Sequence, residues 1–166
     1  MSNVFSKVAG VEKVSMIDMR GYVSCVLFSN KCSGYHCGYC YNIDLWYGRL
    51  PELDPQEIKD YLLSRKNLID YVVFSGGECT LHRDYLIDSA KWCKEQGFKV
   101  KVDTNGSNPN LVIEMIEDGL IDKLITHLLK SCRLQQRCEL VDSHFLLLVV
   151  VQLLRCNRGV VDDILS

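Results

Sequence analysis

The sequence predicts an α/β fold built on a parallel sheet, and three observations support this prediction. Short apolar runs typical of strands alternate along the chain with longer segments of helical periodicity. Several of the helical segments begin or end at residues that favour helix termini. Three of the strand-like runs lead directly into loops rich in cysteine, glycine or polar residues. Helices that connect successive strands in this way indicate right-handed crossovers between parallel strands.

The sequence predicts four strands and three helices. Strands are expected at residues 22–28 (YVSCVLF), 70–75 (DYVVFS), 98–104 (FKVKVDT) and 121–125. Asp54 and Pro55 provide an N-cap and a first-turn proline for a helix over QEIKDYLLSRK. A second helix is predicted over residues 83–96, ending at Gly97. A third is predicted over residues 109–118, ending at Gly119.

Length and charge restrict the class of protein. The 166 residues suffice for one domain with a sizeable core. The 19 Lys and Arg residues nearly balance the 21 Asp and Glu residues, giving a formal net charge of -2. We therefore expect no nucleic-acid partner and no membrane surface, because neither is favoured without a basic field. A small molecule or another protein surface is the expected partner.

The cysteine content indicates a reducing compartment. Nine cysteines occur without a secretory signal in the first twenty residues. The longest apolar stretch, Phe145 to Leu154, is about half of what a membrane-spanning helix needs. Thiols in such a chain more often serve metals or catalysis than disulfides. The sequence therefore predicts a cytoplasmic protein.

The segment KCSGYHCGYCYN places Cys32, Cys37 and Cys40 in one short loop. A structural zinc site normally needs four protein ligands, and His36 is one candidate for the fourth. A four-iron cluster also needs four ligands, but it can leave one iron open for a substrate or cofactor. Taken alone, the loop is as compatible with structural cysteines or a zinc knuckle as it is with a four-iron cluster.

Two further loops with unusual residues also follow predicted strands. Gly76-Gly77-Glu78 follows the second predicted strand, and Asp103-Thr104-Asn105-Gly106 follows the third. Because ligands gather at the carboxyl ends of parallel strands, all three loops are expected to meet at one site. In this order the three motifs resemble the radical S-adenosylmethionine superfamily.

The resemblance is closer around the cysteine loop. SMIDMRGYVSCVLFSNKC followed by CGYCYN is similar to the activating enzymes for glycyl-radical proteins. Within these it is most similar to the group that activates anaerobic ribonucleoside-triphosphate reductase. The resemblance covers residues 15–123 and implies a partial (β/α)6 TIM-like half-barrel, with residues 1–125 as the radical SAM core. The family usually spaces its cysteines C-x3-C-x2-C, whereas this chain reads C-x4-C-x2-C, and Gly34 allows the extra residue to bulge outward.

The resemblance also implies the cofactors. In the family the three thiolates, here Cys32, Cys37 and Cys40, bind three irons of a 4Fe–4S cluster. The amine and carboxylate of S-adenosylmethionine chelate the fourth iron. Tyr39 matches an aromatic position that meets the adenine, although loop packing explains it equally well.

The glycine-rich and polar loops match the family's cofactor contacts. Ser75, Gly76, Gly77 and Glu78 match the motif that receives the methionine amine, and a tight turn is the simpler alternative. Asp103, Thr104 and Asn105 match polar contacts to the ribose or carboxylate. In some activating enzymes the aspartate and threonine also help to hold a monovalent cation. An Asx turn or type I′ turn at Asn105-Gly106 would need no ligand.

The function that the resemblance implies is reductive cleavage of S-adenosylmethionine, followed by formation of a glycyl radical on a partner enzyme. That partner would be the large subunit of anaerobic ribonucleotide reductase, with a flavodoxin-type protein as electron donor. Two alternatives stay open. One is a radical SAM enzyme that acts on a small molecule, as a 7-carboxy-7-deazaguanine synthase does. The other is a non-catalytic zinc-binding module.

Beyond Lys123 the resemblance ends. The family continues into a segment that often contributes an aspartate, but here Asp142 is the nearest acidic residue and its context differs. Residues 126–166 are therefore expected to be either a divergent completion of the same domain or an aberrant segment.

Overall fold

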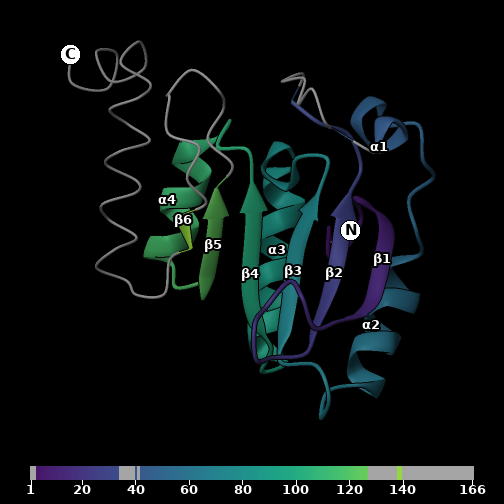
Figure 1. Cartoon of the computed structure of the whole chain (residues 1–166), viewed down its shortest axis with the longest axis vertical. Coiled ribbons are helices and arrows are strands. Elements are labelled where there is room, and N and C mark those ends of the chain that lie inside the picture. The colour runs from purple at the N-terminus through teal and green to yellow at the C-terminus, as the bar shows by residue number, and fades with distance from the viewer. Residues whose placement is uncertain (1–2, 34–39, 41, 127–137, 140–166) are drawn as a thin grey trace.

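A computed structural model of the chain describes residues 3–33, 40, 42–126 and 138–139. Within these residues the strands form one sheet in the order β1-β2-β3-β4-β5-β6 (Figure 1). The strands are β1 Val8–Ser15, β2 Ser24–Ser29, β3 Tyr71–Gly76, β4 Lys99–Thr104, β5 Lys123–Thr126 and β6 Cys138–Glu139. Strands β2 to β5 are parallel, whereas β1 and β6 pair antiparallel with β2 and β5. The predicted α/β fold is confirmed, and the mostly parallel sheet is consistent with a partial TIM-like half-barrel.

Strand β1 is the main element that the sequence did not predict. It is the edge strand next to β2, and its middle residues are exposed or half-buried. Glu12 and Lys13 interrupt its apolar residues, as is common in edge strands that face water. The strand therefore lacks the continuous apolar run that identifies β2 and β3.

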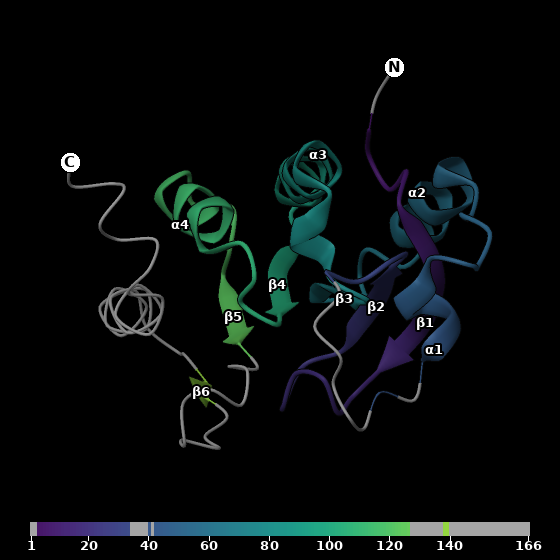
Figure 2. The same ribbon diagram turned by 90° about the horizontal axis from the view of Figure 1, so that it is seen from above.

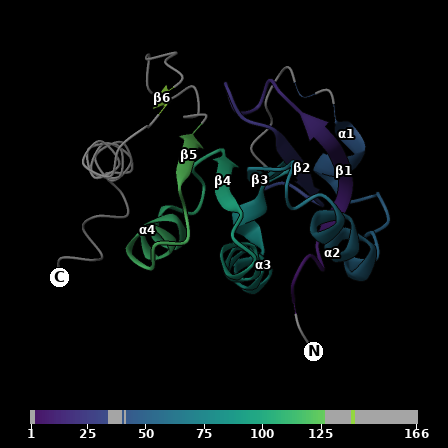
Figure 3. The same cartoon turned by 90° about the horizontal axis from the view of Figure 1, so that it is seen from below.

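Three helices cover one face of the sheet. They are α2 Pro55–Ser64, α3 Arg83–Glu95 and α4 Pro109–Glu117, and they lie on the same side of the strands (Figures 2 and 3). Each lies close to its predicted range. The Asp54 side chain accepts a hydrogen bond from the backbone N–H of Gln56 at 2.9 Å, as expected of an N-cap. A short helix α1, Ile43–Tyr47, and a 3-10 turn, Cys79–Leu81, were not predicted.

The hydrophobic core lies between the sheet and these helices. It includes alternate residues of the parallel strands: Cys25, Leu27, Val72, Phe74, Val100, Val102 and Leu124. Because successive strand residues point to opposite faces, Val26, Val73, Lys101 and Asp103 lie on the face away from the helices. That face is well covered at its centre, since Val73 has no exposed surface and Lys101 is 2% exposed.

Most of the expected C-terminal segment lies outside the described residues, so the two hypotheses for residues 126–166 stay open. No helix in the described part of the chain is long and apolar enough to cross a membrane.

Candidate functional site

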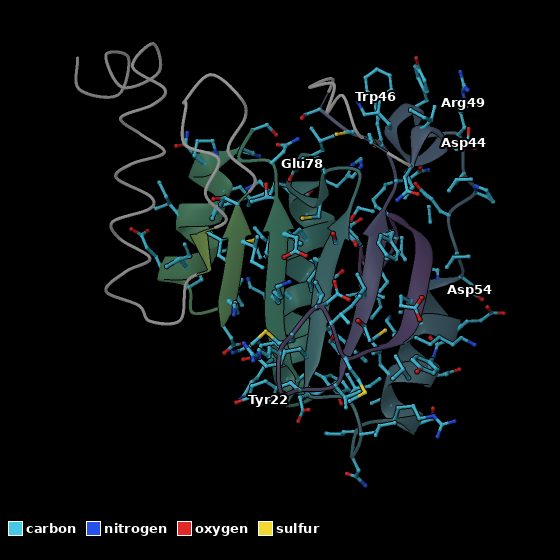
Figure 4. The ribbon with its side chains drawn as sticks, viewed as in Figure 1. Tyr22, Asp44, Trp46, Arg49, Asp54 and Glu78 are labelled. Carbon is cyan, nitrogen blue, oxygen red and sulfur yellow. The ribbon has the colours of Figure 1, made fainter. Side chains whose placement is uncertain are left out.

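The three motif-bearing loops leave the sheet at one edge. Strands β2, β3 and β4 are parallel, so their carboxyl ends at Ser29, Gly76 and Thr104 lie on the same side. Figure 4 shows Glu78 above the ends of β3 and β4, and Trp46 on α1 at the same edge. The expected meeting of the three loops is therefore present in the fold, for the residues that the structure describes.

The Gly-Gly turn packs directly against the chain that leads to the first cysteine. The backbone N–H of Gly77 donates to the Ser29 carbonyl at 3.0 Å, and that of Glu78 donates to the Lys31 carbonyl at 2.9 Å. Gly76 has φ +109°, and a Cβ there would lie 2.8 Å from the Phe28 carbonyl carbon. A Cβ at Gly77 would lie 2.6 Å from the Lys31 carbonyl carbon. Both positions require glycine because backbone fills the space where a side chain would begin.

Helix α1 holds the same segment from the other side. The Lys31 N–H donates to the Leu45 carbonyl at 2.8 Å, and the Cys32 N–H donates to the Trp46 carbonyl at 3.2 Å. Lys31 itself has φ +72°, an uncommon left-handed conformation for a residue with a side chain. The start of the cysteine loop is therefore fixed by backbone contacts to two separate parts of the chain.

Glu78 joins the loops after β3 and β4. Its side chain is 1% exposed. Oε1 accepts from the Thr80 backbone N–H, the Thr80 hydroxyl and the Thr104 hydroxyl at 3.1, 2.6 and 2.7 Å. Oε2 accepts from the backbone N–H of Asn105 at 2.7 Å. A buried carboxylate with four donors is well satisfied, so Glu78 positions the neighbouring loops.

Asn105 extends this network to the cysteine loop. Its Nδ2 donates to Ser33 Oγ at 2.9 Å and lies 3.8 Å from Cys32 Sγ, within hydrogen-bond range for sulfur. Its Oδ1 accepts from the Ser107 N–H at 2.9 Å, which is the Asx turn that the sequence suggested. The turn and the contact with the cysteine loop occur together, so one does not replace the other.

Asp103 forms an ion pair with Lys101. The Lys101 ammonium lies 2.9 Å from Asp103 Oδ1 on the same face of β4. The two side chains are 2% and 15% exposed. A monovalent cation beside Asp103 remains a prediction, and it would share this carboxylate with Lys101.

The described cysteines form two classes. Cys25, Cys79 and Cys93 have no exposed surface. Burial, with a smaller contribution from Glu12, raises the pKa of Cys25 to about 12. Burial also raises the pKa of Cys79 and Cys93 well above the ordinary value. Cys32 and Cys40, in contrast, are half-buried. Only thiolates bind metals well, so the three core cysteines are poor candidates for ligands.

The residues present fit the expected cofactors. Soft thiolate ligands suit an iron–sulfur cluster. Cys32 is held beside the Gly-Gly turn, because both glycines let the backbone of Phe28 and Lys31 approach the turn closely. Cys37 and Tyr39 lie outside the described residues, so their predicted roles stay predictions. Ser75 is the second-last residue of β3, next to this turn, and is half-buried.

Several residues of the site escaped the sequence analysis. Thr80 bonds Glu78, Ser33 bonds Asn105, and Lys101 pairs with Asp103. Lys101 was detectable in principle, since the period of strands places it on the same face as Asp103. Thr80 and Ser33 carry no such signal, because their contacts depend on how the loops fold.

Comparison with known proteins identifies the family. The model of the radical SAM superfamily matches residues 26–130, more than half of the chain. A protein of Methanocaldococcus jannaschii, provisionally named a glycyl-radical enzyme activating enzyme, is 35% identical over 137 residues. That match covers 81% of this chain and 54% of the relative.

Two further relatives cover smaller parts of the chain. The pyruvate formate-lyase-activating enzyme of Clostridium pasteurianum is 37% identical over 62% of this chain and 44% of its own length. An S-adenosylmethionine-dependent nucleotide dehydratase of Selenomonas ruminantium is 34% identical over 51% of this chain and 31% of its own. The chain spans about half the length, or less, of these curated relatives. Together with the motifs and the fold, the family match establishes that the chain belongs to the radical SAM superfamily, which implies a 4Fe–4S cluster and S-adenosylmethionine as cofactors.

Proposed function

We propose that the chain provides the catalytic core of an activating enzyme for a glycyl-radical protein. One observation supports this most: the first cysteine of the loop is hydrogen-bonded into the same edge of the sheet as the GGE and DTNG loops. Two relatives whose names describe activating enzymes favour a protein substrate. The cluster, when bound, supplies the electron that cleaves the sulfonium of S-adenosylmethionine.

The residues of this chain have distinct tasks in the proposal. Cys32, Cys37 and Cys40 hold the cluster through their thiolates. Gly76 and Gly77 bring the turn after β3 into backbone contact with the chain before Cys32, and the resemblance assigns this turn to the methionine part of S-adenosylmethionine. Glu78 holds the loops after β3 and β4 together through its hydrogen bonds with Thr104 and Asn105. The resemblance assigns Asp103, Thr104 and Asn105 to the polar groups of the cofactor. Tyr39 packs against the adenine.

The proposal also names the glycyl-radical enzyme that this chain activates. We assign the anaerobic ribonucleotide reductase group on the similarity of residues 15–42 to its activating proteins. A flavodoxin-type protein is the proposed electron donor. The protein is proposed to act in the cytoplasm without contacting nucleic acid.

Anaerobic reconstitution of the chain tests the first part of the proposal. We expect iron and sulfide to bind in nearly equal amounts, with visible absorption that bleaches on reduction with dithionite. Added S-adenosylmethionine should then give 5′-deoxyadenosine and methionine in a chromatographic assay. Binding of zinc in place of iron and sulfide would contradict the proposal and favour the zinc-binding module.

The partner assignment needs a separate experiment. The reconstituted chain, reduced with dithionite and supplied with S-adenosylmethionine, is mixed with anaerobic ribonucleotide reductase or with pyruvate formate-lyase, and the glycyl radical is measured by electron paramagnetic resonance. A radical on the reductase alone supports the assignment. A radical on the lyase alone would leave the activase proposal intact and correct the partner. Turnover of a nucleotide with neither partner present would favour the small-molecule alternative, which the dehydratase relative represents.

A further inference from the structure

Asn105 links two loops that are 72 to 73 residues apart in sequence. It comes directly after β4, and its Nδ2 donates to Ser33 Oγ at 2.9 Å and to Cys32 Sγ at 3.8 Å. An amide nitrogen carries two hydrogens. Both of them are therefore directed at the first two residues of the cysteine loop.

The orientation of this amide is fixed by its other end. Asn105 Oδ1 accepts a hydrogen bond from the backbone N–H of Ser107 at 2.9 Å. Rotating the amide by half a turn would place its NH₂ group against that N–H, and two donors would then face each other. The hydrogen-bond network therefore requires the nitrogen, and not the oxygen, to face the sulfur.

The position of Asn105 is also fixed before any ligand binds. Its backbone N–H donates to Glu78 Oε2 at 2.7 Å, and Glu78 is buried and held by Thr80 and Thr104. The donor is thus held by the loops that leave β3 and β4. A preorganised donor of this kind needs no rearrangement when charge develops at its acceptor.

A hydrogen bond to a cysteine sulfur changes the redox properties of a cluster. The cluster gains one negative charge when it takes up an electron, and part of that charge resides on the ligand sulfurs. An N–H donor stabilises the reduced form more than the oxidised form and raises the reduction potential. We propose that Asn105 is a positioning residue that donates an N–H···S hydrogen bond to the Cys32 thiolate and makes the cluster easier to reduce. This inference depends on the proposed function, because it needs the cluster to be present.

Asn108 provides a matched control in the same loop. Its Nδ2 also donates a hydrogen bond, but to the Thr80 backbone carbonyl at 3.0 Å. Asn105→Ser and Asn108→Ser therefore make the same chemical change three residues apart. A serine at position 105 can still accept from the Ser107 N–H, but it is too short to keep the contact with Cys32.

The test is a redox titration of the reconstituted full-length chain, followed by absorption and electron paramagnetic resonance, without S-adenosylmethionine. We expect Asn105→Ser to lower the ratio of reduced to oxidised cluster at a given potential by about tenfold, which is about 59 mV for one electron. Asn108→Ser should titrate like the wild type. A cluster in Asn105→Ser with the wild-type potential would overturn the inference, and so would an equal shift in both variants.

Failure of the proposed function is distinguishable from failure of this inference. Iron and sulfide are measured in the wild-type chain before the titration, and their absence contradicts the proposed function itself. If Asn105→Ser binds no cluster, the inference is tested by a measurement on the wild-type chain instead. Asparagine labelled with heavy nitrogen at its side-chain amide should then couple magnetically to the reduced cluster, in the wild type and in Asn108→Ser alike. Absence of that coupling would overturn the inference.

Discussion

The cysteines of the helix-covered core and those of the loop after β2 are the same residue type but differ in burial. Cys25, Cys79 and Cys93 are fully buried, and burial keeps them protonated. Cys32 and Cys40 are half-buried, and Cys32 lies at the edge where three loops meet. Environment, and not residue type, therefore separates thiols that fill the core from thiols that can bind a metal.

The largest expected effect comes from removing a loop thiol. Cys32→Ala should abolish the iron–sulfur absorption and the cleavage of S-adenosylmethionine, because a three-ligand cluster cannot lose one ligand and remain stable. Cys93→Ala should retain iron and sulfide and lose only about 1–2 kcal/mol of unfolding free energy. Metal analysis and urea denaturation measure the two effects. Equal iron content in both variants would remove the distinction between the two classes.

The glycine turn that borders the cysteine loop should be nearly as sensitive. Gly76→Ala combines a strained positive φ with overlap of the Phe28 backbone, for a total cost of about 4 kcal/mol. Gly119→Ala is the control, since its φ is +67° and, among the described residues other than its chain neighbours, no atom lies within 4 Å of the added Cβ. The control should lose only about 1–2 kcal/mol. Urea denaturation of both variants measures the difference, and similar losses would show that the close packing has no role.

Loss of one acceptor at Glu78 should have a smaller effect. In Glu78→Gln one oxygen becomes an NH₂ group, which must face at least one of the donors that Glu78 now accepts from. We expect a loss of about 2–3 kcal/mol, the cost of an unsatisfied buried donor. Urea denaturation measures it, with Glu57→Gln on the exposed surface of α2 as control. An unchanged stability would indicate that the carboxylate does not hold the loops together.

The smallest effect concerns the protonation of a core thiol. The pKa of Cys25 is raised to about 12 in the folded chain, whereas an unfolded cysteine ionises near about 8.5. Between these values the unfolded state releases a proton that the folded state keeps, so stability falls as pH rises. From about pH 8.5 to about pH 10 the wild type should lose about 1.5 kcal/mol more than Cys25→Ala. Urea denaturation at both pH values, under reducing conditions, checks this, and parallel pH profiles would contradict it.

The sequence predicted the parallel strands and the loops that bear the motifs, because each signal is local. Apolar runs such as YVVF identify buried strands, and the carboxyl ends of parallel strands necessarily lie at one edge. Strand β1 was not predicted because Glu12 and Lys13 interrupt its apolar pattern. The contacts of Asn105 with Cys32 and Glu78 depend on how separate loops approach each other, and no local signal encodes them.

The cysteines themselves illustrate the same limit. Cys79 directly follows the GGE motif in sequence, yet its thiol is buried and contacts the carbonyls of Phe74 and Asp103. Sequence proximity to a motif thus did not indicate exposure at the site. The turn after Glu78 directs the next side chain inward, and only the fold shows this.

The anchoring of Cys32 explains how the spacing of the cysteine loop can vary. The residue before Cys32 is bonded both to α1 and to the turn after β3, and Cys32 itself is bonded to α1. The additional residue of the C-x4-C pattern comes only after this sulfur. The loop can therefore gain one residue after Cys32 while Cys32 keeps its position relative to β2 and α1.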